Sequence, residues 1–159
     1  MLARTAPSGI DPQAYLVSEK LDGVRALWDG HVLRFRSGRV VAAPAWFLAQ
    51  LPRQPLDGEL WMGRRRFDEL SAAVRRTEPV DAEWRQVRYH VFELPGAGGR
   101  FAERAEQMQS LANPVIVPVA VKPEAPSRSF ATPKSVKKTS PRLSSMAFDG
   151  FMSRWMTPF

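Results

Sequence analysis

The sequence predicts an α+β fold in which strands and helices are interspersed over the first 112 residues. Short apolar and aromatic runs, bounded by Gly, Asp or Pro, indicate strands. Between these runs, apolar residues recur at helical spacing in two longer segments. The hydrophobic content of 44% is ordinary for a globular domain, and no apolar run is long enough to span a bilayer. We therefore expect strands with flanking helices and no membrane partner.

Strands are expected at six places along the chain. The segments with the strand pattern are residues 15–18, 25–28, 32–36, 56–62, 87–94 and 115–119. Asp29-Gly30 is a strong signal for a two-residue hairpin between the second and third of these segments. Pro118 has no backbone N–H to donate, so the last strand is expected at the edge of a sheet.

Helices are expected in three segments. Pro44 is suited to begin a short helix that continues to Leu48. Two longer helices are indicated by apolar residues that share one face. These residues are Phe67, Leu70 and Val74 in the first helix and Phe101, Ala105, Met108 and Leu111 in the second.

The composition changes near Asn113. Residues 1–112 carry sixteen basic and fourteen acidic side chains, whereas residues 113–159 carry seven basic and two acidic ones. The run from 123 to 145 is too polar and too rich in Pro to bury a core. We expect a compact part over 1–112, followed by a basic, Pro-, Ser- and Lys-rich segment over 113–159 that is partly disordered.

The net charge of +7 and the pI near 10.5 favour an anionic partner such as nucleic acid. The absence of cysteine excludes disulfides, thiolate zinc sites and a cysteine nucleophile. A nucleophile would therefore have to come from another residue type.

Lys20 is the only lysine among the first 112 residues, a stretch that contains fifteen arginines. Arginine does not lose its proton in a protein, whereas a desolvated lysine can become a neutral amine and attack an electrophile. Lys20 is therefore a candidate nucleophile. The alternative is a solvated lysine in a surface turn.

The residues after Lys20 are suited to a nucleotide phosphate. Asp22 shares the side of Lys20 if the segment is extended. Gly23 allows the backbone to approach a ligand closely. Arg25 offers a forked, permanently charged donor for phosphate oxygens.

Glu59 is the first candidate for a metal or ribose contact. It lies with Asp57 and Gly58 inside an apolar strand, where charged residues are rare unless they bind a cation or a polar ligand. Mg²⁺ in particular takes one or two carboxylates and completes its shell with phosphates and water. A turn with one exposed glutamate is the weaker alternative.

Arg64, Arg65 and Arg66 follow this strand and are candidates for contacts with the phosphate backbone of duplex DNA. A solvated basic turn explains the same three residues equally well. The sequence leaves these two interpretations open.

Four segments, in the right order, resemble the motifs of the covalent nucleotidyltransferases. Residues 20–25 are similar to motif I, the Lys-x-Asp-Gly-x-Arg signature of ATP-dependent DNA ligases and mRNA capping enzymes. Residues 56–60 resemble motif III, and residues 89–93 resemble motif IIIa. Residues 34–38 resemble the Ser-Arg-x-Gly motif, although Phe35 stands where Ser is usual.

Over residues 9–112, the spacing and flanking sequence most resemble the minimal bacterial ATP-dependent DNA ligases. The resemblance implies an α+β adenylation domain with antiparallel sheets and flanking helices. It also implies the use of ATP and Mg²⁺ and action on nicked duplex DNA in repair, recombination or replication. In this chemistry Lys20 takes AMP from ATP, the 5′-phosphate of the nick receives it, and the 3′-hydroxyl displaces it.

The resemblance also implies roles for individual residues. Phe92 would stack on the adenine, the backbone of Glu19 would lie against it, and Asp149, which replaces the usual Glu of motif IV, would join Glu59 at the metal. The residues implied to contact the nucleotide are Glu19, Lys20, Arg25, Arg36, Glu59 and Phe92. Asp22 is grouped with Lys20 and Arg25 as catalytic.

The pattern departs from the family after motif IV. Family members continue with motif V and an OB-fold domain, and we expect both to be absent from this chain. Residues 113–159 are then either a diverged region or an out-of-frame reading. Two other functions stay open: a capping or RNA-ligase relative, and an incomplete ligase that binds ATP or DNA without sealing.

Assembly and location are weakly constrained. We expect a monomer. The minimal bacterial ligases are commonly periplasmic, but the start Met1-Leu2-Ala3-Arg4 lacks the apolar stretch of an export signal. A periplasmic and a cytoplasmic location therefore both stay open.

Overall fold

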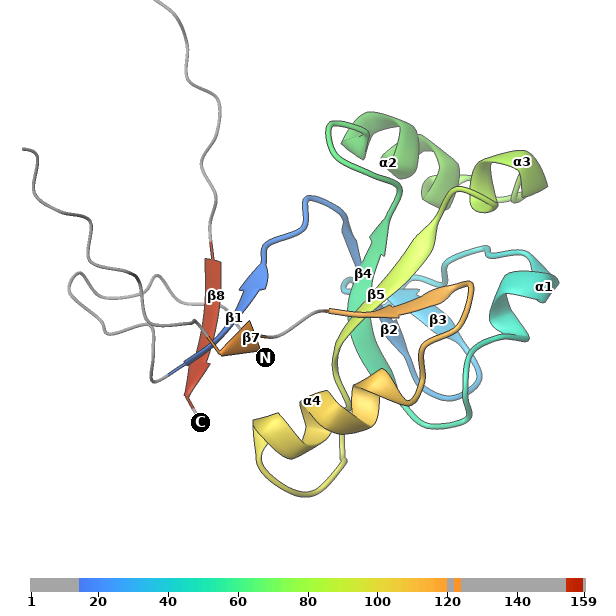
Figure 1. Cartoon of the computed structure of the whole chain (residues 1–159). Helices are drawn as coiled ribbons and strands as arrows, with labels where there is room; N and C mark the ends of the chain where they lie inside the picture. Colours follow the sequence, from blue (N-terminus) through green and yellow to red (C-terminus); the bar gives the residue numbers. More distant parts are fainter. Residues whose placement is uncertain (1–14, 120–121, 124–153, 159) are drawn as a thin grey trace, which may run out of the picture.

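The computed structural model describes residues 15–119, 122–123 and 154–158, with side chains described for residues 18–119 (Figure 1). The strands are β1 (Tyr15–Glu19), β2 (Val24–Trp28), β3 (Leu33–Phe35), β4 (Leu56–Trp61), β5 (Arg88–Glu93), β6 (Ile116–Pro118), β7 (Lys122–Pro123) and β8 (Arg154–Pro158). The helices are α1 (Ala45–Leu48), α2 (Phe67–Arg75), α3 (Asp81–Trp84) and α4 (Phe101–Gln109). The mixed α+β class expected from the sequence is confirmed.

Two sheets are present in the described part of the chain. The larger has five strands in the order β3-β2-β4-β5-β6, and the smaller has three in the order β7-β1-β8. All pairings are antiparallel except that of β5 with β6, which is parallel. Residues 20–23 connect β1 of the small sheet with β2 of the large one, so the segment that carries Lys20 lies between the two sheets (Figure 1).

Several details differ from the sequence-based expectation. The strands β7 and β8 were not predicted, because β7 has only two residues and β8 lies in the basic C-terminal segment. The short helix α3 was not predicted, because four residues are too few to show helical periodicity. The pairing of β5 with β6 makes the large sheet mostly, rather than wholly, antiparallel. The strand β6 was expected at the edge of a sheet, and it does lie at the edge of the large sheet.

Asn113 forms the turn that leads into β6. Its side-chain oxygen accepts hydrogen bonds from the backbone N–H groups of Val115 and Ile116, at 2.8 and 2.7 Å. Its side-chain amide donates to the carbonyl of Gln50 at 2.9 Å. The sheet therefore includes residues beyond Asn113, where the composition changes.

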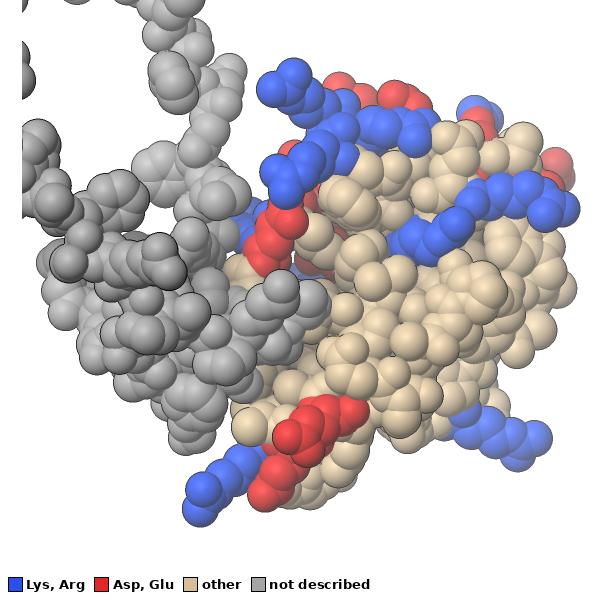
Figure 2. Space-filling view, viewed as in Figure 1, with Lys and Arg blue, Asp and Glu red and all other residues tan. Residues whose placement is uncertain are grey.

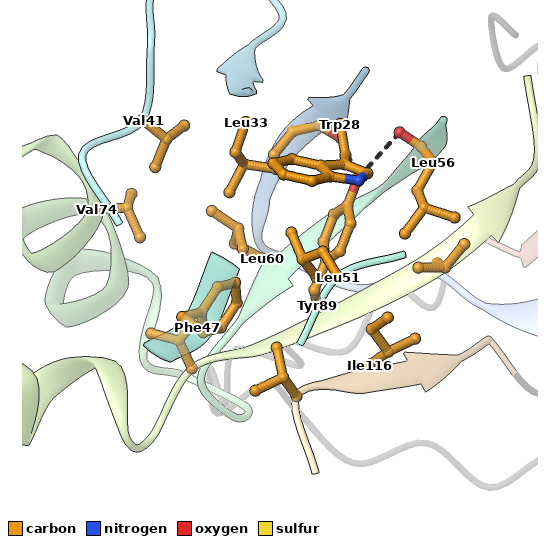
Figure 3. Packing of buried hydrophobic residues seen from close by; sticks show 14 of the residues in the cluster. Trp28, Leu33, Val41, Phe47, Leu51, Leu56, Leu60, Val74, Tyr89 and Ile116 are labelled. Carbon is orange, nitrogen blue, oxygen red and sulfur yellow. Dashed lines mark hydrogen bonds between the residues drawn. The ribbon is translucent and has the colours of Figure 1, made fainter. Parts of the chain in front are cut away.

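One face of the large sheet forms the hydrophobic core. Ala26 and Trp84 of α3 are fully buried there. Leu60, Tyr89 and Phe47 of α1 are buried with them (Figure 3). Side chains alternate between the faces of a strand, so the residues between these positions lie on the opposite face. Across β2, β4 and β5, the register places Arg25, Glu59 and His90 side by side on that second face.

Tyr89 links three strands from inside the core. Its hydroxyl lies 2.9 Å from the carbonyl oxygen of Ala26 and 3.2 Å from that of Leu56 (Figure 3). Burial raises the pKa of this phenol far above its ordinary value, so the hydroxyl stays protonated and donates. The ring of Tyr89 also limits the space beside Gly58.

No helix in the described ranges is long and apolar enough to cross a membrane.

Gly58→Ala is expected to destabilise the fold by about 1–3 kcal/mol, because overpacking a close contact forces the backbone or neighbours to move. A Cβ at this position would lie 2.5 Å from the carbonyl oxygen of His90 and 2.8 Å from the Tyr89 ring. Gly98→Ala is the matched control, since its Cβ would meet nothing within 4 Å. Urea unfolding of both variants measures the difference, and equal stabilities would contradict this account.

Candidate active site

The candidate site lies on the face of the large sheet opposite the core and in the loop that precedes β2. Lys20 and Asp22 are both exposed in this loop. Arg25, Glu59 and Phe92 are partly buried on the neighbouring strands β2, β4 and β5. Residues far apart in the sequence are thus brought onto one surface.

Arg25 and Asp57 form a bidentate ion pair across β2 and β4. The Nε of Arg25 donates to Oδ1 of Asp57 at 3.0 Å, and Nη2 donates to Oδ2 at 2.6 Å. The Asp57 side chain is 5% exposed and that of Arg25 is 23% exposed. Hydrogen bonding to Asp57 raises the pKa of Arg25, so the guanidinium stays charged and fixed in orientation.

Phe92 lies beside this ion pair. The guanidinium carbon of Arg25 is 5.5 Å from the centroid of the Phe92 ring, within the range of a cation–π contact. The ring is partly buried, and it joins β5 to the charged groups on β2 and β4. An aromatic ring next to a fixed cation is suited to binding a flat, electron-rich ligand.

Glu59 joins the Lys20 loop to β4. Its Oε1 accepts a hydrogen bond from the backbone N–H of Gly23 at 3.1 Å. Burial raises the pKa of Glu59, while the Gly23 N–H and the positive charges of Lys20 and Arg25 act in the opposite direction. The carboxylate is therefore held close to the loop and within electrostatic reach of Lys20.

His90 and Trp61 extend the site face beyond Glu59. Their rings contact each other edge to face, with centroids 5.1 Å apart. Burial lowers the pKa of His90, which favours the neutral imidazole. Neither residue was among the candidates from the sequence, because one histidine and one tryptophan in apolar strands are usual core residues.

The three consecutive arginines have different environments. Arg64 forms an ion pair with Glu19 at 2.6 Å, and both side chains are exposed. Arg66 donates to Glu69 and, at 2.8 Å, to Gln86. Arg65 is exposed and has a left-handed backbone conformation with φ of 61°. The three arginines, which look equivalent in the sequence, therefore have different partners and exposures in the structure.

Arg36 and Asp149 were also expected at the site, and no described contact joins Arg36 to it. Arg36 is exposed in the turn that follows β3. Asp149 lies outside the described residues.

The carboxylates allow a limited test for a metal ion. Within the residues whose side chains are described, no three His, Asp or Glu side chains gather as a ready-made metal site. Glu59 and Asp22 are close enough for the charge of Asp22 to raise the pKa of Glu59. Two carboxylates suit Mg²⁺ only when phosphate oxygens and water complete the shell. The donor set therefore fits a metal that arrives with a nucleotide.

Asp57 is a further site residue to which the sequence analysis assigned no role. It precedes Glu59 by two residues in a strand, so both carboxylates lie on the same face. That spacing in the sequence could have indicated that Asp57 belongs to the site. The partner of Asp57 was not readable, because the pairing with Arg25 depends on the register of β2 against β4.

Asp57→Asn is expected to lower the free energy of unfolding by about 2–4 kcal/mol, because it leaves the partly buried charge of Arg25 without its carboxylate. The double variant Arg25→Met with Asp57→Leu is expected to be more stable than the single one, since no buried charge remains. Urea unfolding of both proteins checks this order. A double variant that is less stable than Asp57→Asn would show that the ion pair is not the reason.

Glu59→Gln is expected to gain stability relative to the unchanged protein as the pH rises from about 4, near the ordinary glutamate pKa, toward neutrality. The raised pKa means that the unfolded chain ionises first, so the charged form of Glu59 penalises folding above its ordinary pKa. Glutamine keeps an oxygen for the Gly23 N–H and has no such penalty.

Glu69→Gln serves as the control of opposite sign, because the hydrogen bond from Arg66 lowers the pKa of Glu69. Its small stability difference is expected to move the other way over the same pH range. Urea unfolding midpoints of both variants and the unchanged protein, measured across this pH range, test the prediction. Parallel trends in the two variants would contradict a raised pKa for Glu59.

The chain was compared with protein-family models, curated proteins and solved structures. No family model matches the chain. A curated DNA ligase from Haemophilus influenzae is 35% identical over 98 residues, a match that spans 62% of this chain and 36% of the relative. The chain therefore matches little more than a third of that protein's length.

Solved structures show the same relationship. A structure of a Lig E DNA ligase, described as binding DNA with a minimal scaffold, has a TM-score of 0.69 and 36% identity over 76% of this chain and 50% of its own. Chlorella virus DNA ligase-adenylate has a TM-score of 0.59 at 17% identity, over 76% of this chain and 49% of its own, and so supports the fold alone. Over the part they share, this chain is similar to Lig E and other DNA ligases, its fold is like that of ligase adenylation domains, and it spans about half or less of these relatives' length.

Proposed function

We propose that this chain forms a covalent lysyl-AMP intermediate at Lys20 from ATP, as the first step in sealing nicks in duplex DNA. The observation that carries the proposal is the meeting of three motif segments around one loop. Glu59 binds the backbone of that loop, Arg25 follows it on β2, and Phe92 contacts Arg25 from β5. The relationship to DNA ligases supports the same chemistry.

In the proposed reaction, the Nζ of Lys20 attacks the α-phosphorus of ATP. A P–N bond forms, the bond from the α-phosphorus to the bridging oxygen breaks, and pyrophosphate leaves with the electron pair. Nζ must first lose a proton, because only the neutral amine is a nucleophile. Lys20 is exposed in the loop, so in this proposal the desolvation that favours its neutral form arises when the triphosphate covers it.

The neighbouring residues bind and orient the nucleotide in this proposal. Phe92 stacks on the adenine base, and Arg25 is held by Asp57 in one orientation beside it. Such pre-positioning lowers the barrier because the reacting atoms need no further ordering. Mg²⁺ bound near Glu59 and Asp22 would neutralise charge on the phosphates.

Nicked duplex DNA is the proposed acceptor of AMP. Arg64, Arg65 and Arg66 lie just after β4 and contribute the phosphate contacts in this proposal. Figure 2 shows basic and acidic side chains side by side over the upper part of the molecule, where α2 lies in Figure 1. Because Arg64 and Arg66 already have acidic partners, Arg65 is the arginine most available to a DNA phosphate.

The proposal predicts that α-labelled ATP marks the protein at Lys20. Lys20→Arg keeps the positive charge but has no amine that deprotonates, so labelling is expected to be lost by at least about a thousandfold, the scale of removing a nucleophile. Lys134→Arg is the matched control and should label normally. Label retained in Lys20→Arg would overturn the assignment.

The same assay separates the alternatives. GTP used in place of ATP would indicate a capping-type enzyme, and sealing of RNA in place of DNA would indicate an RNA ligase. Labelling of Lys20 without sealing of a nicked duplex would identify a chain that completes only the first step. Sealing by the 159-residue chain would assign all three steps to it.

Arg65→Ala is expected to weaken binding to nicked DNA and to reduce the slope of log affinity against log salt by about one, because one phosphate contact is lost. Arg76→Ala, whose side chain pairs with Glu83 between α2 and α3, is the control and should leave the slope unchanged. Fluorescence anisotropy over a salt series measures both. Equal slopes for Arg65→Ala and the unchanged protein would show that Arg65 makes no contact with a DNA phosphate.

A further inference from the structure

Phe92 occupies an irregular position in the sheet. Asp57 of β4 pairs with Glu93 of β5, whereas the next residue, Gly58, pairs with Val91. Phe92 is therefore an extra residue on β5, a β-bulge, which re-aims a side chain relative to a regular ladder. Because the ladder with β4 does not hold Phe92 itself, the position of its ring depends on how its two neighbours are anchored.

Glu93, on one side of Phe92, is fixed to α4 by Arg104. The Nε of Arg104 donates to Oε1 of Glu93 at 2.7 Å, and Nη2 donates to Oε2 at 2.9 Å. A third nitrogen, Nη1, donates to the carbonyl of Gly99 at 2.7 Å. The Glu93 and Arg104 side chains are 12% and 17% exposed, so this pair is largely removed from water.

The carboxylate of Glu93 is satisfied within the protein. Its Oε1 also accepts the backbone N–H of Leu94 at 2.9 Å. Burial opposes the charge of Glu93, but the hydrogen bonds from Arg104 and Leu94 outweigh it and lower the pKa of this residue. The end of β5 is therefore held against α4 by a charged contact that persists at neutral pH.

Val91, on the other side of Phe92, is anchored through the backbone. Its carbonyl accepts the N–H of Val119 at 2.8 Å, next to the parallel ladder with β6. Across the sheet, Arg25 lies over the Phe92 ring while Asp57 holds the guanidinium. The bulged residue is thus placed between two anchored neighbours and one oriented cation.

We infer that Glu93 and Arg104 are positioning residues that set the Phe92 ring for stacking on the base of the nucleotide. The inference rests on the proposed function and deepens it, since neither side chain needs to touch ATP. Base stacking is remote from the bond that forms at phosphorus and is made equally in the ground and transition states. Loosening the ring should therefore raise KM for ATP and leave the maximal rate nearly unchanged.

The first test compares two Arg→Lys variants in the full chain. Arg104→Lys keeps the charge but loses the two-pronged contact with Glu93, and KM for ATP in self-adenylation is expected to rise about tenfold, the factor that corresponds to one hydrogen bond to a charged group. Arg76→Lys changes a similar bidentate pair, with Glu83, and should leave KM unchanged. Equal KM values for the two variants would overturn the inference.

A double-variant cycle tests whether Arg104 acts through Phe92. In a Phe92→Leu background, which has no aromatic ring to position, Arg104→Lys is expected to have no further effect on KM. The same tenfold rise in both backgrounds would show a merely structural role and would refute the inference. If Arg104→Lys does not fold, Glu93→Gln, which keeps the shape of the side chain, replaces it in the cycle.

An independent measurement uses no nucleotide. The guanidinium carbon of Arg25 lies over the Phe92 ring, 5.5 Å from its centroid, so the NMR resonance of the neighbouring Nε–H is expected to sense the ring position. In Arg104→Lys this resonance is expected to move toward its value in Phe92→Leu, and in Arg76→Lys it should not move. A resonance unchanged in Arg104→Lys overturns the inference, whereas a failure to label Lys20 overturns only the proposed function.

Discussion

The ion pair between Arg25 and Asp57 is the interaction on which the candidate site depends. It joins β2 to β4 on the face opposite the core, where the register of the two strands brings the side chains together, and its two hydrogen bonds fix the orientation of the guanidinium. A largely buried pair of this kind adds little net stability, because desolvation offsets much of the attraction. Its contribution is geometric: Arg25 is held beside Phe92 without needing a ligand to order it.

The sheet gives its two faces different tasks. Tyr89 and its apolar neighbours bind the helices on one face and provide the hydrophobic stabilisation. The charged residues on the other face then lie on a rigid support, which is what accurate placement of a nucleotide requires. The bulge between Gly58 and Asp57 adds Phe92 to the charged face, where a regular ladder would have a different residue in that place.

The charged residues of the site become more exposed from the strands toward the surface. Arg25 and Asp57 neutralise each other in a largely buried position, and Glu59 is partly buried between them and the Lys20 loop. Arg64 and Glu19 form an exposed pair at the rim, where screening by salt makes such contacts weak.

The sequence by itself determined the α+β class, most of the strands and helices, and the candidate residues Lys20, Arg25, Glu59 and Phe92. These features are local: apolar periodicity, turn residues and short motifs are carried by neighbouring residues in the chain. Tertiary structure decided that Asp57 pairs with Arg25, that Arg104 holds Glu93, and that the consecutive arginines 64–66 have unlike surroundings. Each of these depends on the register and packing of segments separated along the chain, and such contacts leave no periodic trace in a single sequence.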